Sequence, residues 1–315
     1  VEKYGKEKGM EDIPVLLSVG KENLYVWEND ETMMHENDAA EVLYRMTANE
    51  HMHPSDVKEG KIEVIADTEG LLKVDREKLK KVNAFGEMMI ATRHGNTVVK
   101  KGDKLAGTRI IPLVIKKDKM QEAEKICDGT PILKILPFTV KKAAIITTGN
   151  EVYHGRIKDA FTPVIEQKIA EFGAEMMFHE IFDDNDRKIT DGCLRAIEAG
   201  ADIVFCTGGM SVDPDDKTPL AIKNTGAEMI SYGSPVLPGA MFLLSYYRKG
   251  DKVIPICGLP GCAMYNRRTI FDLVLPRLMA ADPVTADELA SLGEGGLCLN
   301  CKVCTFPNCG FGKGW

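Results

Sequence analysis

Three loops of this sequence are rich in carboxylates, and two of them also contain glycine and threonine, a composition that can hold a phosphorylated ligand together with a divalent cation. They comprise residues 147–151, 183–186 and 207–219. Paired glycines let a backbone approach a ligand closely, and free N–H groups at the start of a following helix can hold an anion. Carboxylates suit Mg²⁺, which prefers oxygen ligands and keeps several of its waters. Together the loops predict a site for a phosphate-bearing ligand bridged by Mg²⁺.

The last 18 residues hold a second cluster, the four cysteines Cys298, Cys301, Cys304 and Cys309 in the spacing C-x2-C-x2-C-x4-C. Zinc would take four such thiols as a tetrahedral site. The first three share the C-x2-C-x2-C spacing of bacterial iron–sulfur proteins, although the x4 step and the missing Cys-Pro depart from that pattern. Zinc and an iron–sulfur cluster therefore stay open as metal centres, beside an alternative in which the tail carries only thiols or disulfides.

The three loops follow apolar stretches that predict strands, at residues 143–148, 174–182 and 202–207. Thr162-Pro163 and Thr218-Pro219 each predict the start of a helix, because Thr caps well and Pro suits the first turn. This alternation predicts an α/β domain over residues 141–282, with a mostly parallel sheet and helices on both faces. In such sheets ligands bind at the carboxyl ends of the strands.

Two further elements are expected in the same domain, a hairpin and a long helix. Residues 241–247 and 252–257 predict the hairpin, and Gly261 opens a helix that we expect to run through Ala280. Cys262 would lie at the N-terminus of that helix, where the dipole would lower its thiol pKa.

The preceding residues, 1–140, predict a smaller α+β domain of unknown specificity, and residues 283–315 form the Cys-rich tail. Glycines punctuate this first domain in the manner of a compact module. Its expected strands are residues 62–66, 88–92, 97–99 and 108–115, and its expected helices are residues 38–46, 75–84 and 118–127, with Asp38 as a cap of the first.

Composition narrows the function classes. The chain has 315 residues and a net charge of −7, so it lacks the general attraction to phosphate backbones that a nucleic-acid-binding protein needs. No apolar run approaches the roughly 20 residues that span a bilayer. Nine cysteines, unevenly placed, do not fit a secreted disulfide scaffold. We therefore expect a cytoplasmic protein with no nucleic-acid or membrane partner.

Residues 143–280 resemble the molybdopterin-binding (MoaB/Mog-type) domain family, which molybdopterin adenylyltransferases and molybdotransferases share. The matching pieces are residues 148–151, 183–184, 207–219 and 258–261. The resemblance implies that the glycine-rich loops hold the phosphate of the pterin dithiolene, with Asp183 and Asp216 as catalytic carboxylates near the metal or the activated phosphate. It implies cofactor-binding roles for Thr148, Gly149, Glu151, Thr207, Gly208, Gly209, Ser211, Asp213, Asp215, Lys217, Thr218, Gly258, Pro260 and Gly261.

The resemblance also implies a function in molybdenum-cofactor biosynthesis, with Mg²⁺-dependent insertion of molybdate into molybdopterin as the leading hypothesis. The partners would be molybdopterin and molybdate, and relatives imply a homo-oligomer. The sequence leaves open whether the protein is an enzyme or a carrier. One alternative is a non-enzymatic molybdopterin carrier or molybdoenzyme chaperone, which would dock its partner through the tail. Another is a CinA-like nucleotide pyrophosphatase, because the run Pro-Asp-Asp-Lys-Thr at residues 214–218 is similar to that branch.

Overall fold

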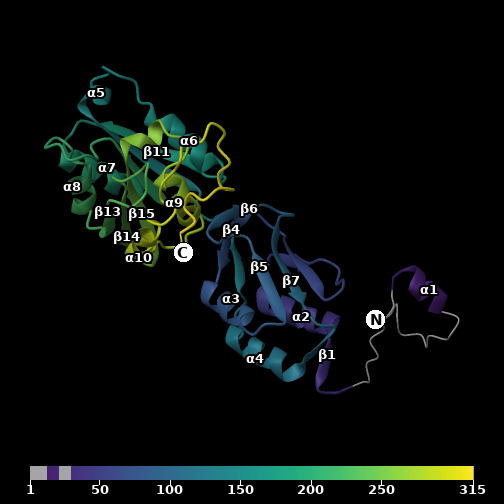
Figure 1. Cartoon of the computed structure of the whole chain (residues 1–315). Coiled ribbons are helices and arrows are strands. Elements are labelled where there is room, and N and C mark those ends of the chain that lie inside the picture. The colour runs from purple at the N-terminus through teal and green to yellow at the C-terminus, as the bar shows by residue number, and fades with distance from the viewer. Residues whose placement is uncertain (1–12, 21–29, 315) are drawn as a thin grey trace.

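The computed structural model describes residues 13–20 and 30–314 (Figure 1). Its buried apolar side chains form separate cores, one within residues 39–135 and two within residues 140–311. The chain passes from the first set to the second between β9 (Leu133–Leu136) and β10 (Lys142–Thr148). We call the parts on either side of this connection the N-terminal and C-terminal modules.

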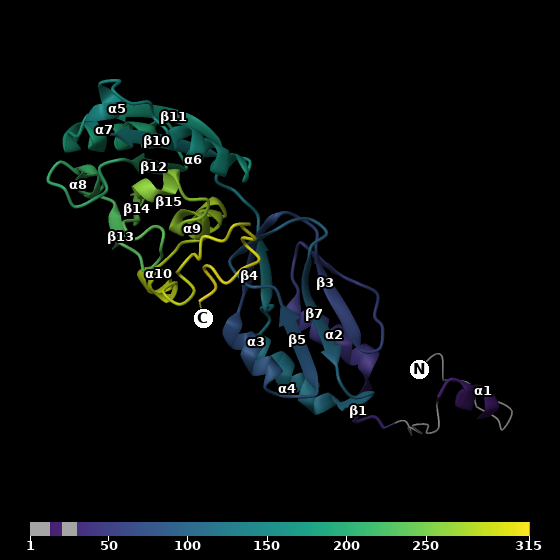
Figure 2. The same cartoon turned by 45° about the horizontal axis from the view of Figure 1, so that its top comes forward.

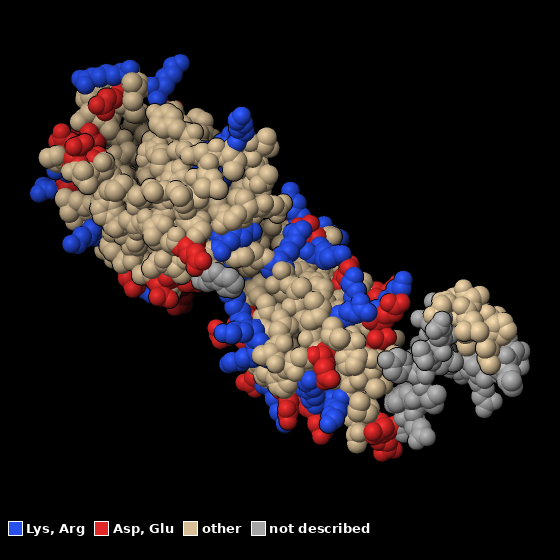
Figure 3. All heavy atoms as spheres, in the orientation of Figure 1, with Lys and Arg blue, Asp and Glu red and all other residues tan. Residues whose placement is uncertain are grey.

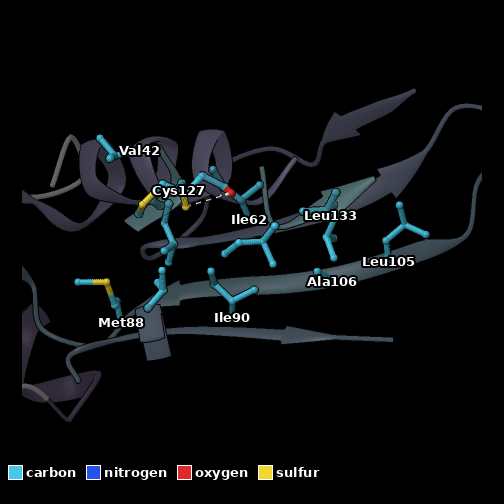
Figure 4. Close-up of a cluster of buried hydrophobic side chains, with 14 of the residues drawn as sticks. Val42, Ile62, Met88, Ile90, Leu105, Ala106, Cys127 and Leu133 are labelled. Atoms are coloured by element: carbon cyan, nitrogen blue, oxygen red, sulfur yellow. Dashed lines mark hydrogen bonds between the residues drawn. The ribbon is translucent and has the colours of Figure 1, made fainter. Parts of the chain in front are cut away.

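The N-terminal module packs helices on antiparallel strands. One sheet has the order β2 (Met52–Pro54), β3 (Lys61–Ala66), β7 (Lys104–Ile110), β5 (Met88–Thr92), and another has β6 (Thr97–Val99), β4 (Gly70–Val74), β9. Helices α2 (Glu36–Thr47), α3 (Arg76–Asn83) and α4 (Lys117–Cys127) accompany them. Figure 4 shows the core, where Val42 of α2 and Cys127 of α4 lie over Ile62 and Ile90 of the strands.

Two local expectations for this module were wrong in detail. The strand expected at 108–115 is interrupted, and β8 (Val114–Lys116) pairs instead with β1 (Met33–His35). Pro112 lies in the break, where its missing N–H cannot serve a ladder. The cap of α2 is His35 rather than Asp38, since the His35 ring accepts from the Asn37 N–H. The short helix α1 (Ile13–Ser18) precedes these elements.

The C-terminal module contains the predicted α/β sheet, with the order β11 (Glu175–Phe182), β10, β12 (Ile203–Thr207), β15 (Lys252–Leu259), β14 (Leu243–Lys249), β13 (Glu228–Tyr232). The first four strands are parallel to one another, and β14 is antiparallel to both of its neighbours. The predicted hairpin is thus confirmed as β14–β15. The α/β fold class with its mostly parallel sheet is confirmed as well.

Alternate side chains of β10 enter different cores on the two faces of this sheet. Ala143 and Ile145 pack in the core that holds residues of α6 (Phe161–Ala170) and α9 (Ile270–Met279). Ala144 and Ile146 pack in the core of α7 (Asp186–Glu198) and α8 (Thr218–Asn224). This period of two explains why β10 reads as a continuous apolar run, since both faces are covered.

The long helix expected from Gly261 through Ala280 is divided. Only a short 3-10 helix, Gly261–Met264, follows Pro260, and α9 begins at Ile270. A capping box of Thr269 and Asp272 defines the N-terminus of α9. The Thr269 hydroxyl accepts from the Phe271 N–H, and the Asp272 carboxylate accepts from the Thr269 N–H at 2.8 Å. These bonds satisfy N–H groups that would otherwise be orphaned at a new helix end.

The tail is built into the C-terminal module. Helix α10 (Ala286–Ser291) contributes Leu289, and the tail contributes Phe311, to the core beside α9. Figure 2 shows the tail returning beside α9 toward β4, where Arg76 donates to the Gly314 carbonyl at 3.2 Å. Within residues 13–20 and 30–314, no helix has both the length and the apolarity that crossing a membrane requires.

Candidate functional site

A cavity of about 740 Å³ lies at the carboxyl ends of β10 and β12. These two strands are parallel neighbours, with Thr147 opposite Thr207, so the loops that follow them start side by side. Eight of the predicted site residues line the cavity: Thr148, Gly149, Glu151, Gly208, Gly209, Asp213, Asp215 and Asp216. The structure therefore brings the first and third predicted loops together, as the parallel topology requires.

The other predicted site residues lie outside the cavity lining: Asp183, Thr207, Ser211, Lys217, Thr218, Gly258, Pro260 and Gly261. Asp183 faces a different partner, because one of its carboxylate oxygens accepts from Lys188 at 2.8 Å. Its neighbour Asp184 lines the cavity instead. The second loop thus contributes a carboxylate, one position later than expected from the sequence.

Gly208 and Gly209 bring the backbone of the third loop against the first loop. Both have positive φ, 82° and 53°. A Cβ on Gly208 would lie 2.1 Å from the Thr148 carbonyl oxygen, and one on Gly209 would lie 2.9 Å from the Thr218 hydroxyl. Only glycine fits such a contact together with such a conformation. The two glycines therefore let the third loop pack directly on the first, and both line the cavity.

Buried threonines hold these loops in place from behind. The Thr148 hydroxyl donates to the Thr207 carbonyl at 3.0 Å, and the Thr218 hydroxyl donates to the Gly208 carbonyl at 2.8 Å. The two hydroxyls also lie 3.0 Å apart. Both side chains are buried, so these bonds are shielded from water. Thr218 thus acts on the cavity through the backbone, without reaching it.

Negative charge dominates the cavity. Six carboxylates line it, those of Glu151, Asp159, Asp184, Asp213, Asp215 and Asp216, against one described cationic side chain, Lys158. Figure 3 shows acidic side chains gathered at the end of the molecule that carries α5 (Asn150–Tyr153) and α8. A cation would reduce this concentration of negative charge. A hydrated Mg²⁺, which keeps several waters and needs only one or two direct carboxylate contacts, is the kind of ion that such a lining could accept.

The pKa of Asp184 is affected by the negative charges of the cavity. Its carboxylate accepts from the Asn150 N–H at 3.1 Å, which ties the second loop to the first. Burial raises its pKa, and the charges of Glu151, Asp215 and Asp216 raise it further, while the Asn150 hydrogen bond opposes them. A bound cation would reverse that shift, because it favours the carboxylate form.

A buried polar network beneath the first loop was missed by sequence reasoning. Asp159 accepts from the hydroxyls of Thr147 and Thr162 at 2.9 and 2.6 Å, and from the Phe161 and Thr162 N–H groups. The ring Nε2 of His179 lies 3.1 Å from the Thr147 hydroxyl. Burial alone would raise the pKa of Asp159, but these hydrogen bonds lower it. An acidic residue two positions before Phe-Thr-Pro was the available signal for it.

A larger cavity, of about 840 Å³, lies between β4 of the N-terminal module and α9. Its lining includes none of the three predicted loops. We therefore place the candidate site at the ends of β10 and β12, where the glycines and carboxylates converge.

The cysteines are all free thiols. Among the described residues, no group of three or more His, Cys, Asp or Glu side chains is arranged to hold a metal ion. Cys262 also differs from expectation: it lies in the short 3-10 helix, and burial raises the pKa of its thiol instead of lowering it.

Comparison with known proteins identifies this part of the chain. The family described as "Probable molybdopterin binding domain" matches residues 144–280. This part of the chain thus matches the molybdopterin-binding domain family. The match contains every residue that lines the cavity, and the family resemblance read from residues 148–151, 183–184, 207–219 and 258–261 is confirmed.

Curated relatives share part of this molybdopterin-binding domain. A "Putative competence-damage inducible protein" of Bacillus cereus (strain B4264) is 30% identical over 129 residues, which are 41% of this chain and 30% of the relative. A protein of the same description from Bacillus subtilis (strain 168) is 32% identical over 85 residues, or 27% of this chain and 20% of the relative. The chain thus spans less than a third of the length of these relatives.

Solved structures also align with part of the chain. The tungsten cofactor synthesizing protein MoaB from Pyrococcus furiosus is 18% identical, with a TM-score of 0.38, and the alignment covers 46% of this chain and 98% of that one. The protein CinA from Thermoplasma acidophilum is 17% identical, with a TM-score of 0.35 and coverage of 44% and 98%.

Proposed function

We propose that this protein binds molybdopterin in the cavity at the ends of β10 and β12 and acts in molybdenum-cofactor assembly, by Mg²⁺-dependent insertion of molybdate into molybdopterin. The position of the cavity supports this proposal. The cavity lies within the matched segment 144–280 and combines Gly208 and Gly209 with six carboxylates.

Each group of cavity residues would have a role that follows from its chemistry. The backbone at Gly149, Gly208 and Gly209 would face the pterin phosphate, where no side chain obstructs its approach. Tyr265 lines the cavity and is 81% exposed, so its ring is available to stack on the flat pterin. Asp184, Asp215 and Asp216 would hold Mg²⁺, which would supply charge neutralisation between the two anionic substrates. The chain's contribution is orientation and electrostatics.

The test compares neighbouring carboxylates. Purified full-length protein would be mixed with molybdopterin, molybdate and Mg²⁺, and metal-loaded pterin would be measured by reconstitution of an apo-molybdoenzyme. We expect Asp184→Asn and Asp216→Asn to lose most of the incorporation. Asp183→Asn, which removes the charge that pairs with Lys188 outside the cavity, serves as the matched control. Wild-type protein that does not bind molybdopterin would refute the proposal.

Binding without incorporation would instead favour the carrier or chaperone alternative. In that case Asp184→Asn and Asp216→Asn would retain binding and function in cells. A homo-oligomeric state is proposed on the resemblance alone, docking of a molybdoenzyme on the tail belongs to the carrier alternative, and a cytoplasmic location is proposed from the cysteine pattern. Light scattering of the purified chain tests the oligomeric state.

A second candidate function is a CinA-like nucleotide pyrophosphatase. The description of the Bacillus relatives and the run Pro-Asp-Asp-Lys-Thr at residues 214–218 favour it. Water would attack a phosphorus of the P–O–P bridge, and the other phosphate would leave. Release of AMP from ADP-ribose in the presence of Mg²⁺, lost in Asp184→Asn, would support this function over molybdate insertion.

A further inference from the structure

All four tail cysteines line a single pocket of about 530 Å³. The pocket lies between the tail and residues 265–268, which connect the short 3-10 helix to α9. The remaining five cysteines are placed differently. Four are buried in the body of the protein, and Cys262 does not line this pocket. Of the nine cysteines, the four of the C-x2-C-x2-C-x4-C run are therefore the ones that line this pocket.

The four thiols surround this pocket without converging on one point. No three of them come close enough together to hold a single metal ion. A Zn²⁺ site requires four sulfurs at about 2.3 Å from one atom. An iron–sulfur cluster spreads its thiolates over several irons, and the first three cysteines here have the C-x2-C-x2-C spacing that such clusters use. This spacing, and the shared pocket, favour the cluster over zinc.

The segment that carries the thiols is anchored at its ends and packs Phe306 and Cys309 against the core, while its middle is exposed. The Cys298 N–H donates to the Leu237 carbonyl at 2.8 Å, and the Gly312 N–H donates to the Gly295 carbonyl at 2.9 Å. Between these anchors the described chain forms no helix or strand, and Leu299 and Val303 are 78% and 75% exposed. Small metallo-segments gain their order from the centre that they ligate.

The local conformation and charge also suit a cluster. Asn300, between the first two cysteines, has a φ of 50°, a left-handed conformation that Asn tolerates and that reverses the chain within a C-x2-C step. The cations Arg267, Arg268 and Lys302 line the pocket. They complement the net negative charge of a centre that four thiolates ligate.

We infer that Cys298, Cys301, Cys304 and Cys309 ligate one iron–sulfur cluster. The inference is independent of the proposed function, because it rests on a different pocket. The two pockets share Tyr265, which lines both. The cluster would therefore lie next to the candidate pterin site, with one exposed aromatic ring between them.

Anaerobic purification, followed where needed by reconstitution with ferrous iron and sulfide, tests this inference. We expect iron and acid-labile sulfide in equal amounts, and a broad absorption near about 400 nm that bleaches on reduction. Zinc bound by the four thiols without sulfide would overturn the cluster assignment. Failure to retain any iron after reconstitution would overturn it as well.

Variants identify the ligands. Cys301→Ser and Cys304→Ser lie on exposed positions, so they should keep the far-UV circular dichroism of the wild type while losing most of the bound iron. Cys262→Ser is the matched control, a nearby thiol outside the pocket, and should retain iron. Retention of iron by both tail variants would contradict the inference. Molybdopterin binding, measured separately on Cys301→Ser, distinguishes failure of the cluster from failure of the pterin site.

Discussion

The Cβ that Gly208 lacks would stand 2.1 Å from the carbonyl oxygen of Thr148. This contact joins the loop after β12 to the end of β10, and Thr148 in turn bonds to the Thr207 carbonyl and the Thr218 hydroxyl. The two loops that line the candidate site are thus packed against each other as one unit. Their contact at Gly208 is made by backbone atoms, because glycine has no side chain.

Gly208→Ala should disrupt this unit. It combines a clash with backbone and a φ of 82°, so we expect the free energy of unfolding to fall by roughly 3–4 kcal/mol, with loss of molybdopterin binding. Gly155→Ala is the control, because Gly155 has a φ of 68° but open space around it, and should cost only about 1–2 kcal/mol. Urea denaturation of both variants measures the difference; equal losses would show that the close contact is immaterial.

The acidic cavity predicts a pH-dependent response to Mg²⁺ at Asp184. Its pKa in the folded protein is raised above 3.8, so the folded state holds this proton more tightly than the unfolded state does. Stability from this group is therefore present at low pH and is lost as the pH rises through the folded pKa. Asp184→Asn should raise the Tm near pH 7 without Mg²⁺, and the gain should vanish below the unfolded pKa.

Mg²⁺ should stabilise the wild type near neutral pH. Added Mg²⁺ should raise the Tm, because it would bind the folded cavity that Asp184, Asp215 and Asp216 line, and EDTA should reverse the effect. In Asp184→Asn the increase should be smaller. Differential scanning calorimetry checks both statements, and an unchanged Tm at millimolar Mg²⁺ would argue against a cation in this cavity.

The stability that Asp159 contributes should depend on pH in the opposite sense to that of Asp184. Its folded pKa is lowered, so its contribution is present above the unfolded pKa and is lost as the pH falls through the folded pKa. Asp159→Ala leaves the hydroxyls of Thr147 and Thr162 without their acceptor and should cost roughly 2–3 kcal/mol at pH 7. The exposed Asp251→Ala should change little. In unfolding curves, the difference between wild type and Asp159→Ala should therefore be full at pH 7 and should shrink as the pH falls through the folded pKa of Asp159.

Arg277 should secure the tail on the core. Its buried guanidinium donates to Asp282 at 2.5 Å and pairs with Glu288 of α10 at 2.8 Å. Arg277→Ala would leave Asp282 and Glu288 without this partner, and we expect a loss of roughly 3 kcal/mol. Arg248→Ala removes an exposed pair, 3.6 Å from Glu228, and should cost less than about 1 kcal/mol. Thermal unfolding compares them; equal effects would contradict a role for burial.

Sequence reasoning predicted the elements whose signals are local. The strands β10, β11 and β12 lie within one residue of their expected starts, because each is an apolar run bounded by Gly or Asp. The helix after Pro260 was predicted wrongly, because the competing start at Thr269 depends on its capping box with Asp272. Such a competition between two helix starts is settled by packing as much as by propensity.

The sequence by itself determined the α/β architecture, the three strand-end loops and the four-cysteine run, since these follow from hydrophobic period, glycine and spacing. Only the tertiary structure decided which side chains meet. Asp183 and Asp184 are neighbours in the chain, yet the first pairs with Lys188 and the second lines the cavity. Consecutive side chains at a strand end point to opposite sides, and nothing local states which side faces the ligand. That choice depends on the pairing of β10 with β11 and β12, which brings together loops about 60 residues apart along the chain.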